Sequence, residues 1–268
     1  MIAMEKVGLL AGVGKLPVEF MRAAKQLGHE VIVIAVVDGV EPELAAEADA
    51  YYEINVAKLD KVIKTLKKNG VAKVTKEILF KGLKFPDWRA IKLLAKLRNR
   101  KDDTIMLAIV DELAKDGLEV VDQTLYLKPL MPACGVLSRR KPTADEEDDI
   151  RFGFVTAKAM GGMDIGQTVV VKHKAVMAVE AIEGTDACIR RGGALGREKS
   201  VVVKVAKPNQ DPRFDVPAVG KQTILSMIES KCNVLAMEAG RTLFVEQDEV
   251  LDLANRHNIC ICAVDKNF

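Results

Sequence analysis

Short apolar runs alternate with amphipathic segments through the first half of the chain. The runs at 7–11 and 31–37 are apolar without interruption, which is typical of parallel strands that are covered on both faces. The pattern predicts strands at 7–11, 31–37, 51–54 and 119–121, and helices at 17–27, 59–68, 87–98 and 103–116. Repeated strand–helix units imply right-handed crossovers and a doubly wound parallel sheet. We therefore expect a Rossmann-like N-terminal domain.

The pattern differs in the second half of the chain. Two β-type runs at 167–173 and 176–182, separated by a short polar turn, predict a hairpin. Further strands are predicted at 201–205, 234–239 and 259–264, and helices at 220–229 and 247–256. Thr143 should cap another helix, because a run of acidic residues follows it and favours the positive end of the helix dipole. We expect an α+β domain with a mixed sheet.

Prolines and a glycine interrupt the chain between these two halves, over residues 128–143. A chain of 268 residues is long for one compact domain and comfortable for two. The predicted organisation is an N-terminal domain at 1–130, a linker at 131–143 and a C-terminal catalytic domain at 144–268.

Composition narrows the class of protein. Forty basic and 38 acidic side chains are mixed along the chain, which argues against nucleic acid as the main partner. Five cysteines form no C-x-x-C pair, and Cys260 and Cys262 alternate in an apolar run as on one face of a buried strand. We expect reduced structural thiols. No cleavable signal and no apolar stretch long enough to span a bilayer is present, so we expect a cytoplasmic protein.

A glycine-rich turn follows the first predicted strand. Gly12 and Gly14 would let backbone N–H groups approach a phosphate at the start of the next helix. The dinucleotide fingerprint requires a glycine where this chain has Pro17, although Asp38 stands where a ribose-binding acid is expected. A nucleotide or sugar-phosphate cradle and a plain tight turn are both open.

An acidic turn followed by arginines and glycines comes after the predicted hairpin. Glu183 and Asp186 are oxygen ligands of the kind that Mg²⁺ prefers. The residues after them could bind phosphate by side chain or by the N–H groups of a Gly-Gly turn. The predicted phosphate-binding residues here are Thr185, Arg190, Arg191, Gly192 and Gly193. A polar turn whose Asp caps a helix is the structural alternative.

The third segment is a proline-punctuated loop at 207–220, between a strand and a helix. Loops of this kind often carry function, and Asp215 could ligate a metal or orient an attacking water. The candidate site residues of this loop are Asn209, Gln210, Asp211, Arg213 and Asp215. A structural loop would use the same prolines, so the residues alone leave both interpretations open.

Two further positions have less support from their neighbours. Arg241 could bind phosphate with help from Glu238, but a turn with a surface ion pair is the more common reason for such a pair. Trp88 is expected to anchor a helix start, with lining of an acyl groove as the alternative. His173 and His257 have no partners at useful spacing and are expected to be non-catalytic.

The segments EAIEGTDACIRRGG and KPNQDPRFDVPAVG carry a resemblance to a known family. Together with AGVGKLP, GVLSRRKPT and MEAGRTLF, they make the chain similar, over essentially its full length, to the UDP-2,3-diacylglucosamine pyrophosphatases of lipid A biosynthesis. This is the form unrelated to calcineurin-like metallophosphoesterases. One departure is the charged stretch 73–81, where the family leads us to expect an apolar strand, so the first sheet is expected to be irregular there.

The resemblance implies hydrolysis of UDP-2,3-diacylglucosamine to UMP and 2,3-diacylglucosamine 1-phosphate (lipid X), with Mg²⁺ or another divalent cation. It implies that Asp215 is the critical aspartate, with Asp211 and Arg213 beside it and Glu183 and Asp186 near the metal. It also implies transient contact with the inner face of the inner membrane, while a homodimer is left open. The alternatives are a nicotinamide-dependent oxidoreductase and a nucleotide-sugar- or lipid-binding regulator without turnover.

Overall fold

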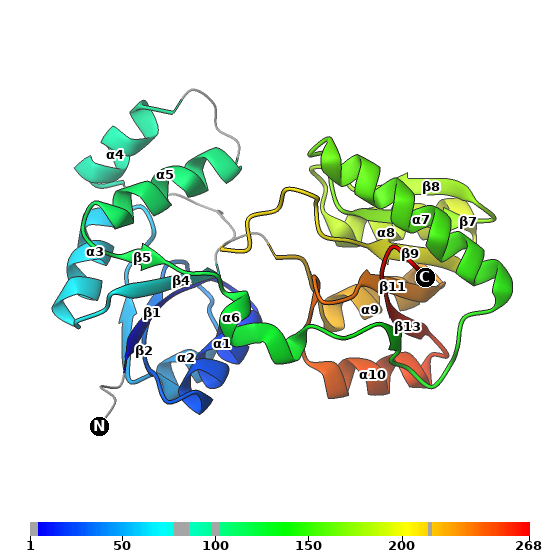
Figure 1. Cartoon of the computed structure of the whole chain (residues 1–268), viewed down its shortest axis with the longest axis horizontal. Coiled ribbons are helices and arrows are strands. Elements are labelled where there is room, and N and C mark those ends of the chain that lie inside the picture. Colours follow the sequence, from blue (N-terminus) through cyan, green and yellow to red (C-terminus); the bar gives the residue numbers. More distant parts are fainter. Residues whose placement is uncertain (1–4, 78–85, 98–101, 214–215) are drawn as a thin grey trace. The chain divides into compact units, whose positions relative to one another are not determined.

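The computed structural model describes residues 5–77, 86–97, 102–213 and 216–268 (Figure 1). These residues form two compact units. The first is built from residues up to Leu127 and the second from Lys128 onward, apart from Pro212 and Arg213, which group with the first unit. The predicted fold class, a parallel-sheet α/β domain followed by a mixed-sheet domain, is confirmed.

The first unit contains a five-stranded sheet in which every neighbouring pair is parallel. Its strands are β1 (Lys6–Ala11), β2 (Glu30–Ala35), β3 (Ala50–Glu53), β4 (Lys73–Glu77) and β5 (Glu119–Val120). The spatial order β3-β2-β1-β4-β5 is that of a Rossmann-type half: β2 and β3 lie on one side of β1, and β4 and β5 lie on the other. The uninterrupted apolar runs of β1 and β2 predicted the parallel sheet correctly, although they did not give its strand order.

Helices cover both faces of this sheet (Figure 1). The helices of the unit are α1 (Leu16–Gln26), α2 (Pro42–Glu47), α3 (Leu59–Lys68), α4 (Trp88–Ala95), α5 (Asp102–Ala114) and α6 (Thr124–Leu127). Side chains of α3, α4 and α5 share one core with Leu10, Ile32 and Ile34. On α1, Phe20 is fully buried and its ring meets that of Tyr126 edge-on at 4.8 Å.

The charged stretch 73–81 does not disturb the sheet where the structure describes it. Residues 73–77 form β4, which pairs in regular register with β1 and at its start with β5, so the expected irregularity is wrong for these residues. Val74 and Thr75 are fully buried, and Lys73 forms an ion pair with Glu5 at 2.7 Å. Backbone pairing on both sides therefore overrides the low apolar content. Residues 78–81 lie outside the described part of the chain.

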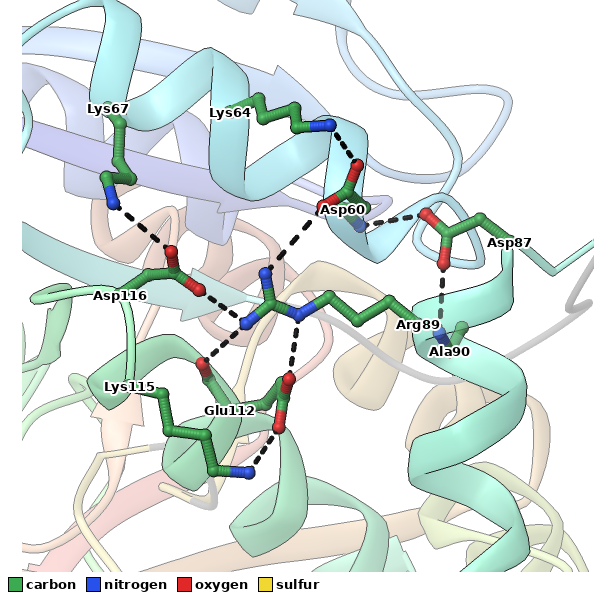
Figure 2. A network of polar contacts seen from close by, with 9 residues as sticks. All are labelled: Asp60, Lys64, Lys67, Asp87, Arg89, Ala90, Glu112, Lys115 and Asp116. Carbon is green, nitrogen blue, oxygen red and sulfur yellow. Dashed lines mark hydrogen bonds and ion pairs between the residues drawn. The ribbon is translucent and has the colours of Figure 1, made fainter.

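A polar network joins α4 to its neighbours (Figure 2). The Arg89 guanidinium donates to Glu112 at 2.7 Å and to Asp116, and lies 3.8 Å from Asp60. Asp87 caps α4 and also accepts the backbone N–H of Asp60 at 2.8 Å. Because these partners come from α3 and from α5 with the turn after it, the network holds three helices in one arrangement.

The second unit contains a six-stranded mixed sheet in the order β6-β13-β11-β9-β7-β8. Its strands are β6 (Gly135–Val136), β7 (Thr168–Lys172), β8 (Ala175–Val179), β9 (Ser200–Lys204), β11 (Cys232–Glu238) and β13 (Cys260–Val264). The central strands β9, β11 and β13 are parallel, and β6, β7 and β8 pair antiparallel to their neighbours. The predicted hairpin of β7 and β8 is confirmed. A short parallel pair joins β10 (Ala218–Val219) to β12 (Leu243–Phe244).

One long helix covers one face of this sheet and three shorter helices cover the other (Figure 1). They are α7 (Ala144–Gly162) on the first face, and α8 (Thr185–Gly196), α9 (Lys221–Glu229) and α10 (Gln247–Arg256) on the second; a 3-10 turn, Lys128–Leu130, precedes them. Strand residues alternate between the two cores, Val201 and Val203 facing α7 and Val202 facing the other helices. Thr143 caps α7 in a capping box with Glu146, as predicted.

Within the segment predicted as a linker, residues 135–138 pair with β13. The N–H of Leu137 donates to the carbonyl of Ile261 at 2.8 Å, and the N–H of Ile261 donates to the Ser138 hydroxyl at 2.8 Å. This stretch therefore forms the edge of the second sheet.

The sequence prediction fails most clearly at α8. Residues 190–193, predicted as a Gly-Gly turn after two arginines, lie inside this helix. A Cβ on Gly192 would lie 2.4 Å from the Val170 Cβ, and one on Gly193 would lie 2.5 Å from the Ser230 Cβ. The glycines therefore let α8 approach β7 and the end of α9 closely. Their backbone N–H groups lie in the helix interior, so the reason for expecting them to bind phosphate is removed.

Candidate functional site

Three buried charged side chains lie at the edge of the second sheet where its parallel strands have their carboxyl ends. The parallel strands β9 and β11 end at this edge with Lys204 and Glu238, and Glu180 follows directly after β8, which ends there because it runs antiparallel to β7. Their exposed fractions are 6%, 7% and 8%. Burying a charge is costly unless it is paired, and ligands of open α/β sheets bind outside the carboxyl ends of the strands. This edge is our candidate site.

Lys204 lies at the N-terminus of α8. Its ammonium donates to the Thr185 hydroxyl at 3.1 Å and to the Ala218 carbonyl at 2.8 Å. Thr185 in turn donates to Glu180 at 2.8 Å, so hydroxyl and carboxylate orient one another. Gly184, with φ of 82°, precedes α8, and no side chain caps the first N–H groups of this helix. A buried cation beside the positive end of a helix dipole favours an anionic group.

An ion pair on the other face of the sheet holds the start of the 207–217 loop. Lys158 of α7 donates to both carboxylate oxygens of Glu238, at 2.9 and 3.0 Å. The same ammonium donates to the Ala206 carbonyl at 2.8 Å, while Glu238 accepts the Ala206 N–H at 2.8 Å. Both backbone groups of Ala206 are thus engaged where the chain leaves β9. The guanidinium of Arg241, predicted to bind phosphate, lies 4.0 Å from Glu238.

The loop is described at residues 207–213 and again from residue 216 onward. Gln210 accepts the Lys207 N–H at 2.9 Å and donates to Gln167 at 3.3 Å, so the start of the loop is tied to the start of β7. Asn209 is exposed, while Asp211 and Arg213 are half-buried. Asp215, the aspartate that the resemblance singles out, lies outside the described residues, and its role stays a prediction.

The two other predicted metal ligands do not converge in the structure. Glu183 accepts from Arg191 on the surface of α8, and this bond lowers the pKa of the Glu183 carboxyl. Asp186 accepts from the Ser226 hydroxyl at 3.1 Å, toward α9. Arg190, also predicted to bind phosphate, pairs with Glu229 at 2.8 Å. Within the described ranges no three His, Cys, Asp or Glu side chains form a group that could hold a metal ion.

The first unit has a pocket of about 540 Å³ at the carboxyl ends of β2 and β3. Its polar lining consists mainly of hydrogen-bond acceptors: Asp38, Glu41, Tyr51, Glu53 and Asn55. Such a lining suits hydroxyl groups and repels phosphates. The predicted cradle residues Gly12 and Gly14 belong to the neighbouring turn after β1 and are not part of this lining.

Lys158, Glu180 and Lys204 were missed by the sequence analysis. A signal existed for Lys204, since it interrupts the apolar run 201–205 and is the one charged residue there. For Glu180 and Lys158 the sequence carried no comparable signal, because their partners come from other segments. Lys158 and Glu238 are 80 positions apart.

The cysteines behave as the alternation predicted. Cys260 and Cys262 lie on the same buried face of β13. Burial raises the pKa of Cys188 to about 12 and that of Cys232 to about 11, so both remain protonated thiols at neutral pH. Cys134 is exposed.

No helix within the described ranges combines the length and the apolar content that a bilayer-spanning segment requires.

Comparison with known proteins identifies both halves of the chain. Residues 6–130 match the family model of the LpxI N-terminal domain, and residues 133–262 match that of the LpxI C-terminal domain. The chain is 30% identical over 278 aligned positions to the UDP-2,3-diacylglucosamine pyrophosphatase LpxI of Caulobacter vibrioides, covering 98% of each protein.

Similarity to solved structures is distant. An ADP complex of N5-carboxyaminoimidazole ribonucleotide synthetase is 14% identical with a TM-score of 0.30, covering 72% of this chain and 46% of that one. The glycinamide-RNase-transformylase T of Mycobacterium tuberculosis is 12% identical with a TM-score of 0.28, covering 49% and 38%. Neither bears on the site. The two domain models and the full-length relative show that the chain belongs to the LpxI family.

Proposed function

We propose that this chain hydrolyses the pyrophosphate bond of UDP-2,3-diacylglucosamine to UMP and 2,3-diacylglucosamine 1-phosphate, a step of lipid A biosynthesis. Family membership supports the reaction, because the full-length relative bears the name of that pyrophosphatase. The observation that carries the proposal is the buried Lys204 ammonium beside Thr185 at the uncapped N-terminus of α8. A pyrophosphate group is the kind of anion that such an arrangement holds.

In this proposal the second unit neutralises charge on the phosphate. As water attacks phosphorus, a P–O bond forms, the anhydride P–O bond breaks, and negative charge grows on the non-bridging oxygens. Lys204 and the first N–H groups of α8 would stabilise that charge in a largely water-excluded position, while Thr185 orients the Lys204 ammonium. Asp215 would orient the water and accept its proton, which the resemblance alone suggests. Lys158 and Glu238 would position the loop that carries Asp215.

Mg²⁺ remains part of the proposal from the resemblance only. Among the described residues Glu183 and Asp186 do not join a ligand cluster, so these two residues do not fit a shared metal ion.

We propose that the pocket of the first unit binds the hydroxyl groups of a sugar. Asp38 and Glu41 follow β2 and Glu53 ends β3, at the strand ends where acidic side chains commonly accept from ribose hydroxyls in Rossmann-type sheets. We further propose that the enzyme meets its lipid substrate at the inner face of the inner membrane.

The direct test is incubation with UDP-2,3-diacylglucosamine, with Mg²⁺ or with chelator, followed by detection of UMP and the lipid monophosphate. Absence of both products with every divalent cation would overturn the proposal. NAD(H) binding would then favour an oxidoreductase, and substrate binding without turnover would favour a regulatory protein.

Asp215→Ala tests the predicted aspartate. Loss of a positioned general base typically costs about 10²–10⁴-fold in rate, so kcat should fall by that order while substrate binding and circular dichroism are kept. Asp252→Ala, which removes an exposed carboxylate of α10, is the matched control and should retain full activity. Full activity of Asp215→Ala would remove Asp215 from the site.

A further inference from the structure

The outer face of α4 carries exposed apolar side chains beside lysines. Trp88 is 69% exposed and Ile91 is 42% exposed. They are three positions apart and so lie on the same side of the helix. Lys92 and Lys96 are exposed as well, and the Lys92 ammonium lies 5.3 Å from the centre of the Trp88 ring. We call these four residues the α4 outer face.

The charged side chains of Asp87 and Arg89 are engaged on the other side of α4, so the α4 outer face carries positive charge only. Arg89 is engaged with Glu112 and Asp116, and Asp87 caps the helix (Figure 2). Ala90 is buried and Leu93 packs against the core, so α4 is anchored from its other side. The packing of α4 therefore does not require an exposed indole.

The sequence around α4 is far more basic than the chain as a whole. From 78 to 101 it contains eight Lys or Arg residues and one Asp, although the net charge of all 268 residues is only +2. Tryptophan is the side chain that prefers the headgroup level of a bilayer, and clusters of basic residues are attracted to anionic lipids. A helix with an aromatic and aliphatic face rimmed by lysines is the pattern of interfacial membrane binding.

We propose that the α4 outer face docks the first unit onto an anionic phospholipid surface. Trp88 and Ile91 insert among the headgroups, and Lys92 and Lys96 contact lipid phosphates. Since α4 has only eight residues, the contact is weak and reversible. Reversible contact suits an enzyme that takes its substrate from a membrane and releases a soluble nucleotide product. The inference rests on the proposed function only in that the substrate lies in a membrane.

The chain offers its own probe, because Trp88 is the only tryptophan in the sequence. The full-length protein is titrated with vesicles of phosphatidylglycerol and phosphatidylethanolamine, and with vesicles of phosphatidylcholine alone. We expect a blue shift of Trp88 emission and quenching by brominated acyl chains with the anionic vesicles only, and reversal by high salt. Emission that is already blue without vesicles and does not respond to them would show that another part of the protein covers this face, and would overturn the proposal.

Substitutions test whether vesicle binding depends on the α4 outer face or only on the net positive charge of the protein. Lys92→Gln with Lys96→Gln should weaken vesicle binding about 10-fold or more, and Ile91→Ser should weaken it further. The control, Lys61→Gln with Lys68→Gln, removes the same charge from exposed positions of α3 and should change binding less than about 3-fold. Equal effects of the two double variants would contradict a specific docking face.

Hydrolysis assays distinguish a failure of the docking proposal from a failure of the proposed function. With substrate in detergent micelles, the α4 variants should keep wild-type kcat; with substrate in anionic vesicles, their rate at low enzyme concentration should fall with their binding. Vesicle binding that is absent while micellar hydrolysis persists would refute the docking face and leave the proposed function intact. Binding without hydrolysis would do the reverse.

Discussion

The two units treat charge differently. Among the described residues of the first unit, the buried polar side chains are Thr75 and Gln123, and neither is charged. In the second unit four charged side chains are buried: Asp149, Glu180, Lys204 and Glu238. Asp149 has a structural reason, because it accepts the N–H groups of His173 and Lys174 in the turn of the β7–β8 hairpin.

The other three buried charges lie along one edge of one sheet, with Lys204 and Glu238 on opposite faces. The ion network around Arg89 in the first unit lies between helices, and its side chains stay partly exposed, so that water lowers the cost of charge (Figure 2). The second unit keeps charge in its interior, where desolvation is expensive. The second unit therefore accepts a stability cost at the edge where we place the phosphate chemistry.

The ion pair of Lys158 and Glu238 should show the largest effect on stability. Glu238→Gln leaves the lysine without its counter-charge and weakens the hold on Ala206, so we expect a loss of about 3 kcal/mol in the free energy of unfolding. Urea denaturation measures this loss. The apolar pair Lys158→Met with Glu238→Leu should recover most of the stability but not the activity. An unchanged denaturation midpoint in Glu238→Gln would contradict the cost that we assign to unpaired buried charge in the second unit.

Lys204→Met tests the buried ammonium directly. Removing one preorganised donor to a developing negative charge typically costs 10²–10³-fold in kcat, or about 2.7–4 kcal/mol, and we expect a loss of that size with a folded protein. Lys172→Met is the control. Its ammonium donates to the carbonyls of Gly196 and Glu198, away from the Lys204 edge, and the variant should keep kcat within about 3-fold. Similar losses in both variants would mean that Lys204 acts on stability alone.

Arg89→Ala should destabilise the first unit more modestly. It removes hydrogen bonds to Glu112 and Asp116 that tie α4 to α5, and bonds to charged groups contribute about 1.5–3 kcal/mol each before solvent screening. Since Arg89 and its partners are partly exposed, we expect a total loss of about 1–2 kcal/mol by thermal denaturation. In detergent micelles kcat should stay near wild type. A large fall in kcat with unchanged stability would contradict a purely structural role of the Arg89 network in the first unit.

The smallest expected effect concerns pH. Ion partners hold the pKa of Glu112 below its ordinary value of 4.5 and that of Asp116 below 3.8: Lys115 and then Arg89 for Glu112, Arg89 and then Lys67 for Asp116. A lowered pKa stabilises the folded state above the unfolded pKa, and this stabilisation is lost as pH falls through the folded pKa. The first unit should therefore lose stability below about pH 4.5, and Arg89→Ala should flatten that dependence. An identical pH profile in the variant would refute the assignment.

Much of the fold could be predicted from local pattern. The unbroken runs of β1 and β2 indicate strands buried on both faces, and α3 and α10 lie where the periodicity placed them. The pattern failed at α8, because two adjacent glycines cost roughly 1 kcal/mol each in an isolated helix and favour a turn. Close packing on Val170 and Ser230 overrides that preference, and no local pattern can show it.

The sequence by itself determined the parallel and mixed sheets, the capped start of α7, the buried face of β13 and, through long motifs, the family. These features follow from periodicity and from residues adjacent in the chain. Only the tertiary structure decided that Lys204 meets Thr185 and that Lys158 meets Glu238. The physical reason is that burial of a charge depends on which distant segments surround it. The tertiary structure also showed that α4 is anchored by Arg89 and leaves Trp88 in solvent.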